Sequence, residues 1–79
     1  MTMKPKIFFA GRWYRCVGFA QSTGLQIGIE VDAETDKALC LREWEEKDKH
    51  CSKIIPGSVP LAAHGEDALL RMFASFILS

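Results

Sequence analysis

The 79 residues have room for one domain, and a composition of 48% hydrophobic and 25% charged residues is typical of a folded globular protein. Ten Lys and Arg residues balance ten Asp and Glu residues, so the chain lacks the strongly basic character of a dedicated nucleic-acid binder. No apolar run approaches the roughly 20 residues that cross a bilayer, and the N-terminus lacks the apolar core of a secretory signal. We therefore expect a cytoplasmic protein without a membrane segment.

The charges are unevenly distributed along the chain. Residues 1–21 contain four basic residues and no acid, whereas residues 22–48 contain eight acids and three bases. This segregation predicts oppositely charged surfaces. The cysteines form no Cys-x-x-Cys pair and are odd in number, so we expect free thiols at Cys16, Cys40 and Cys51.

The first third of the chain predicts a β-hairpin. Residues 7–10 and 13–19 are rich in β-branched and aromatic side chains, and Gly11-Arg12 between them fits a two-residue type II′ turn. Residues 21–24 are polar and end in Gly, which indicates a second turn. The hairpin should therefore lead directly into a further strand.

Residues 25–32 are the clearest strand, because every odd position is a large aliphatic residue and every even one is polar or Gly. The pattern predicts one buried face and one exposed face. After a turn at 33–37, residues 38–44 are predicted to form a fourth strand. A helix remains an alternative for that segment, because Ala38, Leu41 and Trp44 are spaced three apart.

The segment that follows looks irregular. Residues 45–50 are charged without apolar periodicity, and Pro56-Gly57 and Pro60 argue against regular structure in 54–60. We expect Ile54, Ile55 or Val59 to pack against the core as the chain crosses it.

The C-terminal segment 65–79 predicts an amphipathic helix. Two acids in its first turn, Glu66 and Asp67, favour a start near Gly65. Its apolar residues recur at the spacing of one helix face, and they are Leu69, Met72, Phe73, Phe76 and Ile77.

Together these elements predict a single α+β domain over residues 1–79, with a three- or four-stranded antiparallel sheet packed on one face by a single C-terminal helix. The opposite sheet face would then remain uncovered. Such a face could bind a partner or a second copy of the chain, and its predicted residues are Gln26, Gly28, Glu30 and Asp32.

The sequence offers few candidates for chemistry. His50, Cys51 and His64 could supply a nucleophile and base or soft metal ligands, but their spacing matches no familiar zinc pattern. Adjacent side chains such as His50 and Cys51 would often point apart. A domain this small also has little interior left for a ligand pocket. We therefore expect a non-enzymatic protein with no catalytic residue, metal or cofactor.

Two charged stretches are candidates for partner binding. Arg12-Trp13-Tyr14-Arg15 interleaves cations with aromatic rings, a pattern that single-stranded nucleic-acid binders use, although an ordinary hairpin gives it too. The acidic stretch could dock a basic partner, and its candidate contacts are Glu30, Asp32, Glu43, Glu45 and Glu46. Alternatively, Arg12 and Arg15 could contact an acidic rim.

In its size, single-domain character, lack of a catalytic motif, hairpin 10–14 and turn 32–37, the chain resembles the small phage-encoded anti-CRISPR proteins. Several of these are sheet-plus-helix domains. The resemblance implies a phage- or prophage-encoded inhibitor in the host cytoplasm. Such an inhibitor would bind a bacterial CRISPR effector complex and occlude its nucleic-acid-binding surface. The alternative is a small single-stranded nucleic-acid-binding protein that uses Arg12, Trp13, Tyr14 and Arg15.

Overall fold

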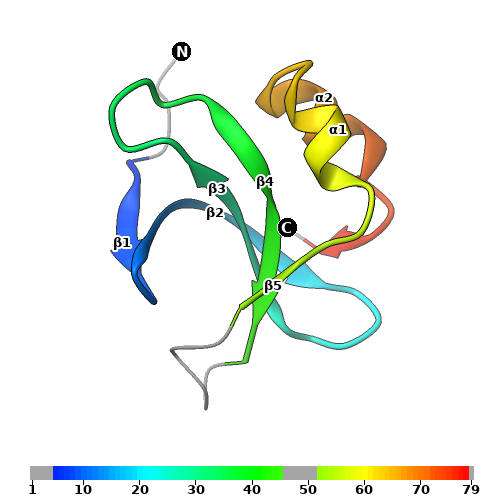
Figure 1. The fold of residues 1–79 in the computed structure, drawn as a ribbon. Coiled ribbons are helices and arrows are strands. Elements are labelled where there is room, and N and C mark those ends of the chain that lie inside the picture. Colours follow the sequence, from blue (N-terminus) through cyan, green and yellow to red (C-terminus); the bar gives the residue numbers. More distant parts are fainter. Residues whose placement is uncertain (1–4, 46–51, 79) are drawn as a thin grey trace.

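The computed structural model describes residues 5–45 and 52–78. One antiparallel sheet organises the fold, and two short helices pack on one of its faces (Figure 1). The strand order is β1-β2-β3-β4-β5, and β6 pairs with the side of β2 that faces away from β3. The elements are β1 (Ile7–Phe9), β2 (Arg12–Ala20), β3 (Gln26–Val31), β4 (Ala38–Trp44), β5 (Lys53–Ile54), α1 (Ser58–Ala62), α2 (Glu66–Met72) and β6 (Ile77–Leu78).

The predicted α+β class with an antiparallel sheet is confirmed, and residues 38–44 form a strand rather than a helix. The sheet gains two strands of two residues each, β5 and β6. The C-terminal helical region consists of two short helices instead of one. Within the described residues, no helix is both long and apolar enough to cross a membrane.

The first hairpin turns one residue earlier than predicted. Phe9 pairs with Arg12, so the two turn residues are Ala10 and Gly11. Their φ angles are 53° and 79°, and positive values at both positions are characteristic of a type I′ turn, not of the predicted type II′ turn at Gly11-Arg12. A type I′ turn matches the right-handed twist of the strands on either side.

The main core lies between the sheet and the helices. Ile27, Ile29 and Val31 of β3 are at most 3% exposed, as the alternation of residues 25–32 predicts. Leu41 of β4 and Leu69 of α2 are completely buried in the same cluster. Leu69, the first residue of the predicted apolar helix face, therefore packs in the core as its spacing indicates.

The C-terminal helix ends at Met72, whereas the sequence predicts a helix to residue 79. Phe73 leaves helical geometry with φ −106° and ψ 17°, and Ile77 then pairs with Ala20 on β2. Ile77 still joins the core, but through β6 rather than a helical turn. Met72, predicted to face the core, is 64% exposed. Strand pairing prevails here because it satisfies backbone groups at the edge of β2 that a longer helix would leave unpaired.

Residues 54–60, predicted to lack regular structure, contain the end of β5 and the start of α1. Pro60 is the third residue of α1, where a backbone N–H has no acceptor within the helix, so proline costs little there. Of the three candidates for core contact, Ile55 is buried, whereas Ile54 and Val59 are about half exposed.

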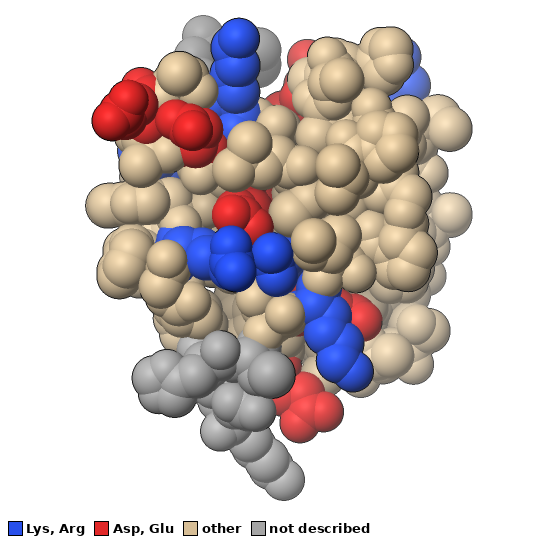
Figure 2. Space-filling view, viewed as in Figure 1, with Lys and Arg blue, Asp and Glu red and all other residues tan. Residues whose placement is uncertain are grey.

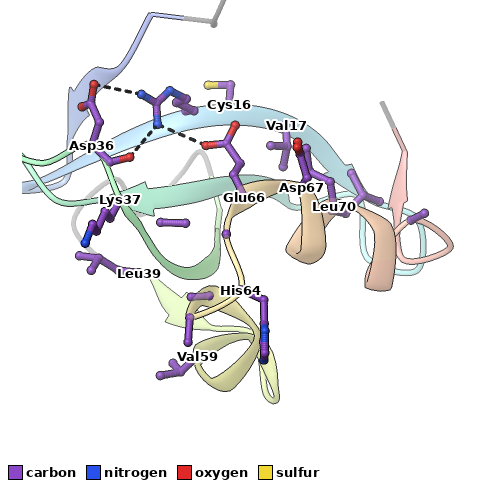
Figure 3. A pocket seen from close by; sticks show the side chains of 17 residues that line it. Cys16, Val17, Asp36, Lys37, Leu39, Val59, His64, Glu66, Asp67 and Leu70 are labelled. Atoms are coloured by element: carbon purple, nitrogen blue, oxygen red, sulfur yellow. Dashed lines mark hydrogen bonds and ion pairs between the residues drawn. The ribbon is translucent and has the colours of Figure 1, made fainter.

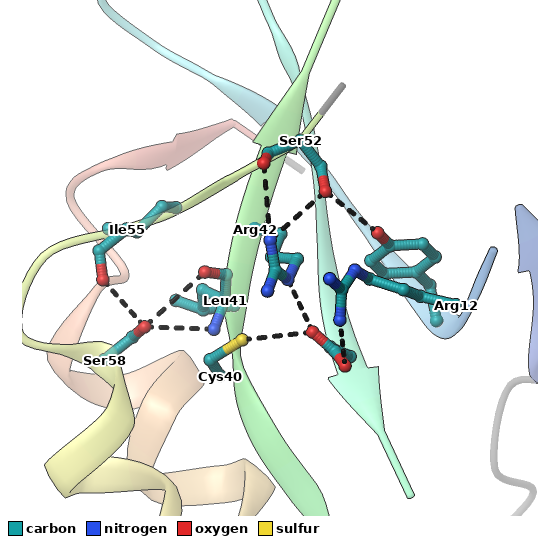
Figure 4. A network of polar contacts seen from close by, with 9 residues as sticks. Arg12, Cys40, Leu41, Arg42, Ser52, Ile55 and Ser58 are labelled. Carbon is teal, nitrogen blue, oxygen red and sulfur yellow. Dashed lines mark hydrogen bonds and ion pairs between the residues drawn. The ribbon is translucent and has the colours of Figure 1, made fainter. Parts of the chain in front are cut away.

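Ser58 fixes the start of α1 to the edge of β4. Its hydroxyl accepts the backbone N–H of Leu41 at 3.1 Å and donates to the carbonyl oxygen of Ile55 at 2.8 Å (Figure 4). The side chain is completely buried. Ser58 therefore supplies an acceptor to β4 beyond the point where β5 ends.

The sheet face opposite the helices is not exposed along its length, contrary to the prediction for residues 26–32. Phe9 on β1 contacts Trp44 on β4 with ring centroids 5.3 Å apart, although these strands would be about 14 Å apart in a flat sheet. The sheet therefore curls toward this face. Tyr14 packs on the same indole at 4.7 Å, and the Trp44 ring covers Gly28. An aromatic cluster thus occupies much of the surface predicted to be uncovered.

Candidate functional site

A groove of about 1310 Å³ opens between β2, the start of β4 and the two helices (Figure 3). Residues from all four elements line it. Because most of its lining residues belong to packed helices and strands, the groove is already formed before any ligand binds. Representative lining residues are Arg15, Cys16 and Val17 of β2, Leu39 of β4, Val59 of α1 and Leu70 of α2.

Part of the groove lining is apolar and open to solvent. Leu39 is 42% exposed and Val59 is 51% exposed, while Val17 and Leu70 are partly buried. Scattered apolar residues are normal on protein surfaces, but these line one concavity. The lining therefore offers a partner apolar area at a defined place.

Arg15 ties together the two sides of the groove. Its guanidinium group lies 3.3 Å from Asp36, before β4, and 3.2 Å from Glu66, at the start of α2 (Figure 3). The side chain is only 5% exposed. Each carboxylate neutralises part of the guanidinium charge, and the arginine side chain is largely shielded from solvent. This contact therefore holds α2 against the turn between β3 and β4.

Asp36 has a second cationic neighbour. Its Oδ1 atom accepts a hydrogen bond from Lys6 Nζ at 2.6 Å, and this bond, with the charges of Lys6 and Arg15, lowers the pKa of Asp36. The carboxylate is therefore ionised at neutral pH. Its Lys6 contact also draws the start of the chain toward the β3–β4 turn.

The groove has more acidic than basic side chains. Asp36, Glu66 and Asp67 line it together with Arg15 and Lys37, and His64 is neutral in the formal charge count. Asp67 is exposed and makes no ion pair within the described residues. The lining therefore has an accessible carboxylate beside an apolar surface, which suits a partner with a positive charge next to an apolar group.

One edge of β2 has a gap in its strand pairing beside this groove. β1 pairs with β2 only as far as Tyr14, and β6 pairs from Phe19 onward. Among the described residues, no strand pairs with residues 15–18 on that side. Figure 3 shows β2 continuing past Cys16 and Val17, above the residues of α2. Within residues 5–45 and 52–78, the groove wall thus includes a stretch of the β2 edge, around Cys16 and Val17, that pairs with no other strand.

The opposite face of the sheet carries a polar network around Glu30. Its carboxylate accepts hydrogen bonds from Arg12 at 3.2 Å and from Nε of Arg42, and Arg42 also donates to Ser52 (Figure 4). Figure 2 shows a band of Lys and Arg side chains across one face of the molecule, beside a small acidic patch. The hydroxyl groups of Tyr14 and Ser52 extend the network at 3.3 Å.

This network determines the ionisation of its members. Burial opposes the ionisation of Glu30, but the hydrogen bond and charge of Arg42 and the charge of Arg12 outweigh it and lower the Glu30 pKa. Burial and the Glu30 charge raise the pKa of Cys40 to about 11. Cys40 is therefore a protonated thiol at neutral pH, without the reactivity of a thiolate.

The structure separates the four residues of the predicted nucleic-acid-binding stretch. Arg12 and Tyr14 point to the curled face, whereas Trp13 and Arg15 belong to the helix side. Tyr14 is completely buried, so its ring is not available to stack on a base. These four side chains do not form one binding surface, because strand residues alternate between faces.

The predicted acidic contacts are dispersed as well. Asp32 accepts the backbone N–H groups of Thr35 and Glu34 in a turn, and these bonds lower its pKa. Glu30 and Glu43 lie on opposite faces of the sheet, since Glu30 pairs with Cys40 and Glu43 is three residues further. Glu45 is exposed, and Glu46 lies outside the described residues.

Glu43 buries one carboxylate oxygen that has no hydrogen-bond partner within residues 5–45 and 52–78. His50 and Cys51, two of the candidates for chemistry, lie outside the described residues, while His64 is exposed and lines the groove. The described residues contain no cluster of three His, Cys, Asp or Glu side chains that could hold a metal ion.

Several groove residues escaped sequence reasoning. Leu39 lies in the predicted strand 38–44, and Val59 is one of the residues expected to pack against the core. Both remain exposed because the groove separates them from a packing partner. Asp67 was interpreted only as a helix-terminal charge. No local pattern distinguishes an exposed apolar residue of a groove from one of the core.

Comparisons of the chain with protein-family models, with curated proteins and with solved structures gave no match.

Proposed function

We propose that this protein acts by binding another protein, without catalysing a reaction, and that the groove between β2, β4 and the helices is its contact surface. The observation that supports this most is the pair Leu39 and Val59, which are 42% and 51% exposed inside one concavity. Covering half of an aliphatic side chain is worth on the order of 1 kcal/mol. A partner that fills the groove therefore gains binding free energy by covering these side chains.

The charge of the groove favours a basic partner. Asp67 is an exposed carboxylate of the lining and makes no ion pair within the described residues, whereas Asp36 and Glu66 pair with Arg15. Basic surfaces are typical of proteins that bind nucleic acid. We therefore propose an inhibitor that covers such a surface on its target.

The proposed target is a bacterial CRISPR effector complex in the host cytoplasm. This part of the proposal depends on the resemblance of the chain to anti-CRISPR proteins and on the exposed carboxylate of Asp67 in the groove. Direct binding of single-stranded nucleic acid has less support, because Tyr14 is buried and Arg15 is engaged with Asp36 and Glu66.

The experiment measures target-DNA binding by purified CRISPR effector complexes of several types, with and without the protein. We expect one type to lose DNA binding. The double variant Leu39→Ser/Val59→Ser should inhibit at least tenfold less strongly. Met72→Ser is the matched control, because Met72 is an exposed apolar residue outside the groove lining.

Two results would contradict the proposal. Equal inhibition by the groove variant and the control would show that the groove is not the contact. Sub-micromolar binding of free single strands at physiological salt, lost on Arg12→Glu, would favour the nucleic-acid-binding alternative.

A further inference from the structure

We propose that the groove binds an extended, cationic segment of the partner, which adds to the sheet as a strand antiparallel to β2 in the gap between β1 and β6. This inference rests on the proposed protein-binding function and specifies what the partner must contain. It follows from the strand pairing, from the direction of α2 and from the charges that lie below the gap.

The gap exposes backbone groups of β2. Phe9 and Arg12 close a two-residue turn, so they form a hydrogen-bonded pair, and alternation directs Tyr14 toward β1 as well. By the same alternation, the backbone N–H and C=O of Cys16 point to this edge, beyond Ile7, where β1 begins. Backbone groups at a sheet edge are recognised by another extended chain.

Among the described residues, those that precede β1 do not pair with β2 in this gap. Lys6 extends toward the β3–β4 turn, where its ammonium group donates to Ala33 O and Asp36 Oδ1. Pro5 precedes it and has no N–H to donate. β1 pairing therefore stops at Ile7.

The neighbouring strands define the direction and length of the partner segment, which we call the guest. β1 and β6 both run antiparallel to β2, so a segment that continues their line also runs antiparallel. The gap covers residues 15–18 of β2. At about 3.3 Å per residue, three or four guest residues fill it.

α2 determines which side chains the guest needs. Glu66, at its start, contacts Arg15, and Ile77, shortly after its end, pairs with Ala20. The helix therefore runs in the same direction as β2, and an antiparallel guest runs against it. Such a guest passes Leu70 first and reaches Asp67 afterwards (Figure 3).

The spacing on α2 matches that of a strand. Asp67 and Leu70 are three residues apart and lie about 5–6 Å from each other on one helix side. Alternate residues of a strand are about 6.6 Å apart on one face. The structure thus favours a guest with the order apolar-x-Lys/Arg, in which the apolar side chain contacts Leu70 and the cation reaches Asp67.

The test uses synthetic peptides and ¹⁵N-labelled protein. The probe is acetyl-Thr-Thr-Val-Thr-Lys-Thr-Thr-amide, and one control peptide exchanges the positions of Val and Lys. A second control carries N-methyl groups on two consecutive central residues, which blocks pairing in either register. We expect saturable shifts of the Cys16 and Val17 amide resonances with the probe, and at least tenfold weaker binding of both controls.

A charge exchange makes the test specific. Asp67→Lys should weaken binding of the Lys peptide at least tenfold and strengthen binding of the same peptide with Glu in place of Lys. Glu34→Lys, at an exposed site outside the groove, should change neither. Equal binding of the N-methylated peptide or of the exchanged order would overturn the inference.

The outcomes separate this inference from the proposed function. If the effector complex is bound through Leu39 and Val59 but none of the peptides binds, strand addition is wrong and the protein-binding function stands. If the peptides bind as expected and no effector complex is bound, the guest chemistry stands and the proposed target is wrong.

Discussion

Gly28 lies beneath the Trp44 ring, and its replacement by Ala should destabilise the fold. A Cβ atom at this position would lie 3.0 Å from Cη2 and 3.3 Å from Cζ3 of Trp44, and 3.3 Å from the backbone oxygen of Arg15. Carbon atoms prefer separations of about 3.5–4.0 Å. The indole has little room to withdraw, because it is 3% exposed and packs against Tyr14.

The sign of the change in stability shows whether the close contact with Trp44 or the backbone preference of Ala over Gly dominates at this position. Overpacking of this kind costs about 1–3 kcal/mol. Without a close approach, Gly→Ala in a strand would instead stabilise by roughly 0.5–1 kcal/mol. We expect Gly28→Ala to cost about 2 kcal/mol, which corresponds to a fall in Tm of roughly 8–16 °C for a domain of this size.

Urea unfolding of four proteins checks the cause: wild type, Gly28→Ala, Trp44→Phe and the double variant. Trp44→Phe removes the outer ring atoms that would meet the new methyl group. Gly28→Ala should therefore cost at least about 1 kcal/mol less in the Phe background than in the wild type. The same cost in both backgrounds, or stabilisation by Gly28→Ala alone, would refute the argument.

Three further measurements test the core and the polar network. Leu69→Ala should cost about 2–5 kcal/mol in urea unfolding, because Leu69 is completely buried, whereas Ser75→Ala at an exposed site should stay within about 0.5 kcal/mol; equal midpoints would contradict the core assignment. Glu30 has a lowered folded-state pKa, so its ionised form stabilises the fold above its ordinary value of 4.5, and this contribution disappears as the pH falls through the lowered pKa. The stability difference between the wild type and Glu30→Gln should therefore diminish between about pH 6 and pH 3, and a difference that does not depend on pH would oppose this reasoning. Iodoacetamide at about pH 8, followed by peptide mass mapping, should modify the exposed Cys16 long before Cys40, whose pKa is about 11; similar rates at both sites would show that Cys40 is not protected.

The sequence predicts the parts of the fold that depend on local periodicity. Ile27, Ile29 and Val31 alternate along β3, and all three are buried as expected. The sequence does not predict that Gly28 is buried, because the side chain that covers it belongs to Trp44, sixteen residues away. A period of two indicates that the two faces of a strand differ in polarity, but it does not identify the distant side chain that covers either face.

The C-terminal segment shows a second limit. Apolar residues spaced three and four apart fit a helix, and Leu69 confirms this for α2. Phe76 and Ile77 continue the spacing, yet they reach the core through a turn and β6. The choice depends on whether the edge of β2 offers unpaired backbone groups, and only the assembled sheet determines that.

The candidate site was the least predictable part. Arg12 and Arg15 were grouped because they are close in sequence, but alternation along β2 places them on different faces. Period two alone was sufficient to foresee this separation. The groove itself was not foreseeable, since Val59 and Asp67 meet the edge of β2 only through the packing of both helices.

Ser58 has a consequence for how copies of this protein can assemble. Its hydroxyl occupies the N–H of Leu41, and β5 covers the neighbouring part of β4, so this side of the sheet offers little to an incoming strand. A filament made by sheet pairing needs two open sides on every copy. Two copies that met through the gap in β2 would each present outward a side whose edge strand, β5, has only two residues, and growth would stop at a symmetric pair. One buried hydroxyl group thus helps to keep an open edge from leading to unlimited polymerisation.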